Sequence, residues 1–196
     1  FYKNLIINLS LDFYVVICDP NPLKQDTVKS QVYDRADCVL SWDETNLELI
    51  SSEIVAQKLD ILVYPDIGMT LLSVCLAAMR LAPVQCNMMG HPLTSGLSTM
   101  DYYISAEIFE HGDSDSFYTE NLVCIKGMPV QYDQPNLGFI DKPRHEFGFS
   151  NEDHLYVCPM VPFKLMPEFD DVLVAICRKD PKAKIVLFRY CGQESI

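Results

Sequence analysis

A glycine-bounded loop, GHPLTSG at residues 90–96, carries the side chains of this chain best suited to ligand chemistry. The imidazole of His91 titrates near neutral pH, so it can hydrogen-bond a sugar or phosphate or transfer a proton. Thr94 and Ser95 add hydroxyl groups beside it. In open α/β sheets, ligands bind at the carboxyl ends of strands, where this loop begins. The alternative is a tight connection whose polar side chains cap their own backbone. The residues alone favour this alternative over a ligand site.

A second candidate is Lys164, which lies between a predicted strand and the start of a predicted helix. Amide groups and the dipole at a helix start favour phosphate, and a lysine ammonium suits a diphosphate as a compact point charge. The alternative is an ordinary exposed lysine, which is the better supported reading of the residue by itself. The four histidines are too far apart to form a metal site, so none is predicted.

These residues need a scaffold, and the chain alternates strand-like apolar runs with segments of helical periodicity. This order is typical of βαβ units, so the sequence predicts an α/β fold with mainly parallel sheets. The strands are expected at residues 13–18, 38–42, 60–64, 84–89, from 102 onward, 122–126, 154–158 and 184–188, and helices at 47–59, 71–80 and 169–177.

The apolar runs at 13–18 and 60–64 predict strands buried on both faces. Right-handed crossovers would place the loops after Tyr64 and Met89 at one sheet edge, so Asp66, Thr70 and the residue 90–96 loop are expected to border one cleft.

Residues 127–150 contain many prolines, glycines and aromatic residues without a period. So long a segment without regular structure predicts an interdomain connection, with one unit at residues 1–126 and another at 151–196.

Composition narrows the function classes. The net charge of -12 disfavours binding to nucleic acid or an anionic membrane, and no apolar run reaches the length of a membrane span. The eight cysteines are widely spaced and mostly lie in apolar runs, which predicts reduced core thiols and a cytoplasmic location.

Three short motifs resemble the signature of the O-GlcNAc transferase family. The chain reads Leu-Ala-Pro-Val-Gln at 81–85, Gly-His-Pro-Leu-Thr-Ser-Gly at 90–96 and Asp-Tyr at 101–102. The family pattern is Arg-Pro-Ala-Pro-Ile-Gln, Gly-Tyr-Pro-Gly-Thr-Ser/Thr-Gly and Asp-Tyr. His91 in place of tyrosine, and Asp-Ile-Gly-Met at 66–69, are closer to the bacterial adhesin-modifying N-glucosyltransferases.

The resemblance implies a GT-B-like fold of two Rossmann-like halves. Residues 1–126 would form the later part of the first half, and residues 151–196 the start of the second, nucleotide-binding half. The implied reaction is metal-independent and needs no cofactor. It transfers GlcNAc or glucose from UDP-GlcNAc or UDP-glucose to a Ser, Thr or Asn side chain of an acceptor protein.

The resemblance also implies site residues. Gly90, His91, Pro92 and Thr94 match the donor-sugar pocket, and Lys164 matches a lysine that contacts the UDP diphosphate. Gln193 matches a nucleotide-binding glutamine more weakly, and an exposed glutamine near a terminus is its alternative. No catalytic residue is assigned.

The family's early histidine-bearing loop would precede Phe1, and its Gly-His-Thr-Thr-Gly helix start would follow Ile196. We therefore expect a central fragment with little or no transferase activity by itself. The replacement of the family's polar residues by Met-Val-Pro at 160–162 favours an alternative, a catalytically inactive α/β protein-interaction module built on the same scaffold.

Overall fold

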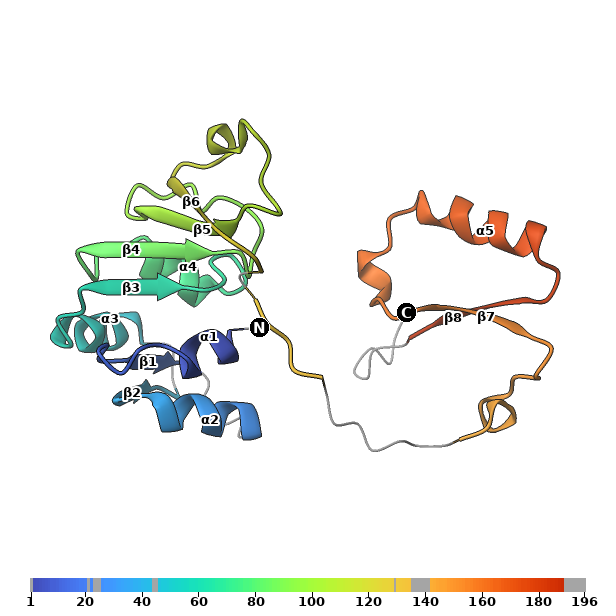
Figure 1. The fold of residues 1–196 in the computed structure, drawn as a ribbon, viewed down its shortest axis with the longest axis horizontal. Coiled ribbons are helices and arrows are strands. Elements are labelled where there is room, and N and C mark those ends of the chain that lie inside the picture. The colour runs from blue at the N-terminus through green and yellow to red at the C-terminus, as the bar shows by residue number, and fades with distance from the viewer. Residues whose placement is uncertain are drawn as a thin grey trace. The chain divides into compact units, whose positions relative to one another are not determined.

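A computed structural model describes residues 2–20, 22, 26–43, 46–128, 130–134 and 142–188. Two compact units divide the chain, Phe1–Gln134 and Pro135–Ile196, and each is described by itself (Figure 1). The boundary between them lies inside the stretch 127–150.

The first unit is built on parallel strands. Strands β3 to β6 form a four-stranded sheet in chain order, and β1 pairs with β2; every pairing is parallel. Its elements are α1 (Lys3–Ile7), β1 (Val16–Asp19), α2 (Thr27–Arg35), β2 (Cys38–Ser41), α3 (Leu47–Ala56), β3 (Ile61–Tyr64), α4 (Leu71–Ala77), β4 (Val84–Met88), β5 (Tyr102–Ala106), the 3-10 helix η1 (Ser114–Phe117) and β6 (Asn121–Ile125). The predicted parallel α/β fold is therefore confirmed.

A hydrophobic core cluster lies on the Tyr64 face of the sheet, and Cys86 and Met88 of β4 are buried on the opposite face. Tyr64 packs with Ile50 of α3 and Leu76 of α4, all nearly inaccessible to solvent. Ile61 and Val63 alternate with the core-facing positions of β3 and are 55% and 45% exposed. The prediction that residues 60–64 are buried on both faces is wrong, because α3 and α4 cover only the Tyr64 side.

The first predicted strand needs a similar correction. Phe13 and Tyr14 lie outside β1 and are exposed, and all four residues of β1 are only half-buried. The prediction that residues 13–18 form a strand buried on both faces is therefore wrong. Strand β4 is more completely enclosed, with four of its five residues buried.

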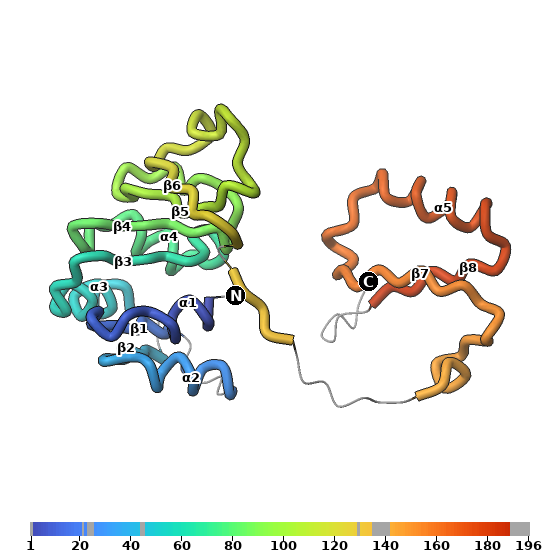
Figure 2. Tube along the Cα trace, viewed as in Figure 1, coloured from blue at the N-terminus to red at the C-terminus, as the bar shows by residue number. Residues whose placement is uncertain are grey.

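The connection from β4 to β5 contains no helix, as the tube trace shows (Figure 2). It includes the glycine-bounded loop of residues 90–96, called the Gly90 loop below. Its conformation therefore depends on contacts with other elements rather than on helical hydrogen bonds.

The second unit is a single βαβ unit. Strands β7 (His154–Cys158) and β8 (Ala183–Leu187) pair in parallel; between them come the 3-10 helix η3 (Pro162–Lys164) and α5 (Phe169–Lys179), and η2 (Arg144–Phe147) precedes them. No residue within 142–188 is fully buried. One helix and two strands offer too little surface to enclose a side chain on all sides.

The seven cysteines in the described part of the chain are free thiols. Of these, Cys86 is buried and four others are half-buried, whereas Cys124 and Cys177 are exposed, so the prediction that the cysteines are core residues is wrong for Cys124 and Cys177. Among the described helices, none has the length and hydropathy needed to cross a bilayer.

Candidate functional site

The Gly90 loop begins packed against the turn that follows β3. The Gly90 amide donates a hydrogen bond of 2.8 Å to the Pro65 carbonyl. A Cβ at position 90 would lie 2.3 Å from that carbonyl oxygen and 2.9 Å from the Asp66 Cβ, so no larger residue fits. The loops after β3 and β4 therefore meet at the carboxyl edge of the sheet, as the crossover argument predicted.

His91 continues this contact one residue later. Its ring packs so closely on Gly68 that a Cβ there would lie 2.9 Å from His91 Cδ2, and Gly68 has a φ of 103°. The hydroxyl of buried Tyr103 donates to the His91 carbonyl at 3.1 Å. The imidazole itself makes no hydrogen bond to a described residue, so its nitrogens are free to meet a ligand.

Tyr2, Asp66 and Thr70 near this edge differ in their roles. Tyr2 donates to the Pro65 carbonyl at 3.2 Å, and burial together with the nearby charge of Asp66 raises the pKa of Tyr2 to about 12. Thr70 is the N-cap of α4, where its side chain accepts from the Ser73 amide at 3.1 Å. Asp66 thus lies beside the Gly90 loop, whereas Thr70 has a structural role.

The far half of the Gly90 loop is held by Glu120. The Thr94 hydroxyl donates to Glu120 Oε2 at 2.6 Å, and the Ser95 amide donates to Oε1 at 2.9 Å. Glu120 directly precedes β6, at the amino end of that strand. The structure therefore places Gly90 and His91 at the carboxyl edge and ties Thr94 toward the amino edge. A sugar-pocket role for Thr94 stays a prediction, as does that of exposed Pro92.

Gln85, the last residue of the first motif, is a structural residue. It is fully buried; its side-chain amide donates to the carbonyls of Met79 and Thr99 at 3.0 and 2.9 Å and accepts from the Leu81 amide at 3.0 Å. This one side chain joins the end of α4 to the segment that enters β5.

Asp101, of the Asp-Tyr motif, completes that junction. Its carboxylate accepts from the Gln85 amide at 2.8 Å and forms an ion pair with Arg80. The hydrogen bonds from Arg80 and then from Gln85 hold the pKa of Asp101 below its usual range, despite some desolvation. Much of the family signature thus builds the scaffold under the loop.

Lys164 ends η3 and borders a hollow of about 380 Å³ beside the start of α5. It is exposed and forms no ion pair with a described residue. Asp170 and Asp171 occupy the first turn of α5, and their charges already meet the positive end of the helix dipole. Any attraction for phosphate here therefore comes from the ammonium group rather than from the helix start. Gln193 lies outside the described residues.

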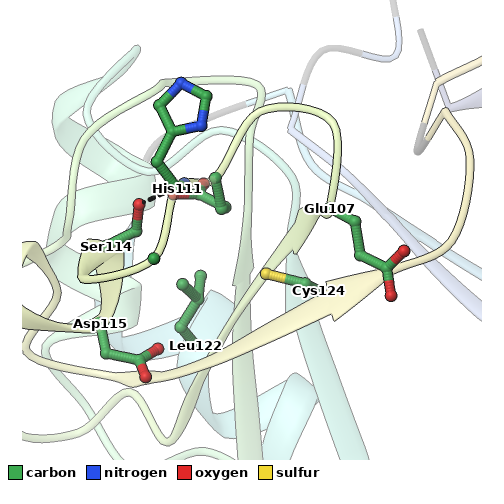
Figure 3. A pocket seen from close by; sticks show the side chains of 8 residues that line it. Glu107, His111, Ser114, Asp115, Leu122 and Cys124 are labelled. Atoms are coloured by element: carbon green, nitrogen blue, oxygen red, sulfur yellow. Dashed lines mark hydrogen bonds between the residues drawn. The ribbon is translucent and has the colours of Figure 1, made fainter.

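A further hollow of about 260 Å³ is lined by residues that follow β5, among them Glu107 and Ser114, and by Leu122 and Cys124 of β6 (Figure 3). Glu110 accepts from the Ser105 and Tyr118 hydroxyls at 2.6 and 2.8 Å. Burial opposes its charge, but these hydrogen bonds prevail and hold its pKa below the usual range. Among the described residues, no three His, Cys, Asp or Glu side chains form a metal-binding group.

Sequence reasoning missed Glu120. A glutamate between a threonine and the start of a strand follows no motif, and its partners lie 25 residues earlier in the chain. Only the fold shows that this carboxylate is buried against the loop.

A comparison with models of protein families finds no match. A curated relative, "Probable UDP-N-acetylglucosamine--peptide N-acetylglucosaminyltransferase SEC" of Arabidopsis thaliana, is 28% identical over 119 residues, which are 58% of this chain and 12% of the plant protein. Among solved structures, a mutant of the O-GlcNAc transferase of Thermobaculum terrenum is similar with a TM-score of 0.74 and 21% identity, covering 94% of this chain and 34% of that one.

These similarities confirm the resemblance to the O-GlcNAc transferases and the GT-B-like fold expected from it. The chain spans about a third of the solved bacterial protein and 12% of the plant protein.

Proposed function

We propose that this chain contributes donor-site residues to a UDP-sugar-dependent protein glycosyltransferase, which transfers GlcNAc or glucose to a Ser, Thr or Asn side chain. The observation that carries the proposal is the arrangement of His91. Its carbonyl accepts from Tyr103 and its ring packs on Gly68 at the carboxyl edge of a parallel sheet, while the ring nitrogens have no hydrogen-bond partner among the described residues. The names of the two similar proteins support the same reaction class.

Each candidate residue has a separate role in the proposed reaction. The Gly90 loop positions the sugar, with His91 as a hydrogen-bonding group, because a fixed loop lowers the entropic cost of orientation. The Lys164 ammonium offsets the negative charge that develops on the leaving UDP. We propose no metal or cofactor for this reaction.

Saturation-transfer NMR on the full chain tests the proposal, since it detects weak binding. UDP, UDP-GlcNAc and UDP-glucose are the probes. We expect transfer to the uridine protons of all three, reduced at least fivefold by Lys164→Ala but unchanged by Lys184→Ala. We expect His91→Ala to reduce transfer to the sugar protons, with His111→Ala as its control. Absence of transfer from the wild-type chain overturns the proposal.

A second candidate function is a catalytically inactive protein-interaction module. The acidic first turn of α5 favours it, because Asp170 and Asp171 repel an approaching phosphate. The same NMR experiment decides, since this module would bind neither UDP nor a UDP-sugar.

A further inference from the structure

Glu120 is an unusual carboxylate for a loop contact. It is 5% exposed and forms no ion pair with a described cation. A buried charge is costly unless hydrogen bonds replace its water. Four donors do so: the Ser95 amide and hydroxyl, the Thr94 hydroxyl and the Thr119 hydroxyl.

These four bonds require the ionised form of Glu120. An ionised carboxylate only accepts hydrogen bonds, whereas a protonated carboxyl or an amide must also donate. All four groups, which belong to Thr94, Ser95 and Thr119, can present a hydrogen to Glu120; the Thr94 hydroxyl also accepts from the Thr119 amide at 3.0 Å and lies 2.9 Å from the Thr119 hydroxyl. The pKa of Glu120 is held below its usual range, because the bonds from Ser95 and Thr94 outweigh the opposing effect of burial.

The Gly90 loop is therefore attached at two places. Its first half is fixed by Pro65, Gly68 and Tyr103, and its second half by Glu120. Between the two attachments, Pro92 and Leu93 are exposed and form no hydrogen bond to a described residue. If the bonds to Glu120 are released, the Thr119 amide still donates to Thr94, but no hydrogen bond from Pro92 or Leu93 to a described residue restrains the loop.

We propose that Glu120 is a positioning residue, whose ionised carboxylate sets the path of the Gly90 loop and so keeps His91 in place for the donor sugar. This inference rests on the proposed function of the loop. Glu120 contacts neither Gly90 nor His91 by a hydrogen bond, so it acts through Thr94 and Ser95 rather than on the ligand.

Hydrogen exchange of the full chain tests the attachment without any ligand. In Glu120→Gln, an amide group replaces one acceptor oxygen and meets the donors of Ser95 and Thr94. We expect the Ser95 amide to exchange at least tenfold faster, while the amides of β3 and β4 keep their wild-type rates. The matched control is Glu107→Gln, an exposed carboxylate that does not contact the loop. Unchanged exchange at Ser95 overturns the inference.

A pH titration of the Ser95 amide signal adds a readout that loss of packing alone would not move. In the wild-type chain the signal should shift as Glu120 takes up a proton, with a midpoint below the ordinary glutamate value of 4.5. Glu120→Gln should abolish this titration, and Glu107→Gln should retain it. A Ser95 signal that titrates identically in all three proteins overturns the inference.

Milder variants keep the test decisive if Glu120→Gln does not fold. Thr94→Val removes one donor to Glu120, and Thr94→Ser retains it. We expect the valine variant to speed exchange at Ser95 and the serine variant to restore wild-type exchange. Equal exchange in both overturns the inference.

Donor binding separates this inference from the proposed function. If the wild-type chain binds UDP-GlcNAc or UDP-glucose, Glu120→Gln should reduce saturation transfer to the sugar protons at least threefold and leave the uridine protons unchanged. Unchanged sugar transfer in a loosened loop overturns the positioning role but leaves the proposed function standing. Failure of the wild-type chain to bind overturns the proposed function, and the sugar-positioning role with it, whatever the exchange data show.

Discussion

The Gly90 loop and the Lys164 segment look alike in sequence, since each is a short connection after a strand with one residue suited to a UDP-sugar. In the structure they differ. The loop is fastened by buried groups, Tyr103 near its start and Glu120 near its end. The Lys164 segment is an exposed 3-10 turn with no fully buried residue around it. The first region is preorganised by the fold, whereas the second supplies a charge on an exposed side chain.

The two units also differ in net charge. Residues 1–134 contain seven Lys and Arg against eighteen Asp and Glu, whereas residues 135–196 contain eight against nine. By net charge, the first unit therefore repels anions more strongly than the nearly neutral second unit. This division is compatible with the proposed roles, an uncharged sugar at the Gly90 loop and a diphosphate at Lys164.

The largest expected effect comes from removing the support beneath the loop. Gln85→Leu leaves two carbonyls and one amide without partners in the interior, and should lower the free energy of unfolding by about 4 kcal/mol. Urea unfolding measures it, with exposed Gln31→Leu on α2 as the control. A change below about 1 kcal/mol would contradict the inference that the buried Gln85 side chain holds the end of α4 to the segment that enters β5.

Gly90→Ala should have the next largest effect. The new methyl group would overlap the Pro65 carbonyl, and we expect a loss of about 2 kcal/mol in unfolding free energy. Thermal unfolding measures it. Gly112→Ala is the matched control, because a Cβ there has no neighbour within 4 Å. Equal stability of the two variants would show that the loop shifts freely.

Asp101→Asn should cost about 1 kcal/mol at neutral pH and less in acid. Arg80 lowers the folded-state pKa of Asp101, so the charged carboxylate stabilises the fold above its ordinary value of 3.8. That contribution is lost as the pH falls through the lowered folded-state pKa. Urea unfolding of both proteins between pH 7 and 3 should show the difference shrinking. A difference that grows in acid would contradict this sign.

The smallest expected effect on stability is that of Lys164→Ala. An exposed side chain without an ion pair to a described residue should change the unfolding free energy by less than about 0.5 kcal/mol. Thermal unfolding of the full chain measures it. A loss above 1 kcal/mol would give Lys164 a structural role and weaken the contrast between the two regions.

Local sequence patterns were sufficient for the order of the strands and of helices α3, α4 and α5, and for the meeting of the loops after Tyr64 and Met89. They were misleading for the faces of the sheet. The apolar run at residues 60–64 is the same whether one or two layers of helices cover it, so the exposure of Ile61 and Val63 was not readable from it.

The alternation of apolar runs, the glycines of the loop and the family motifs are properties of neighbouring residues, and they were enough to predict a parallel α/β fold and its candidate loop. Other features depend on partners far away in the chain. They are the direction of Thr94, the imidazole of His91 without a hydrogen bond to a described residue, and the buried charge of Glu120. Ser95 and Glu120 are 25 residues apart, and only the pairing of β4, β5 and β6 in one sheet brings them together. Tertiary packing decided these features because hydrogen bonds between distant segments leave no periodic trace in the sequence.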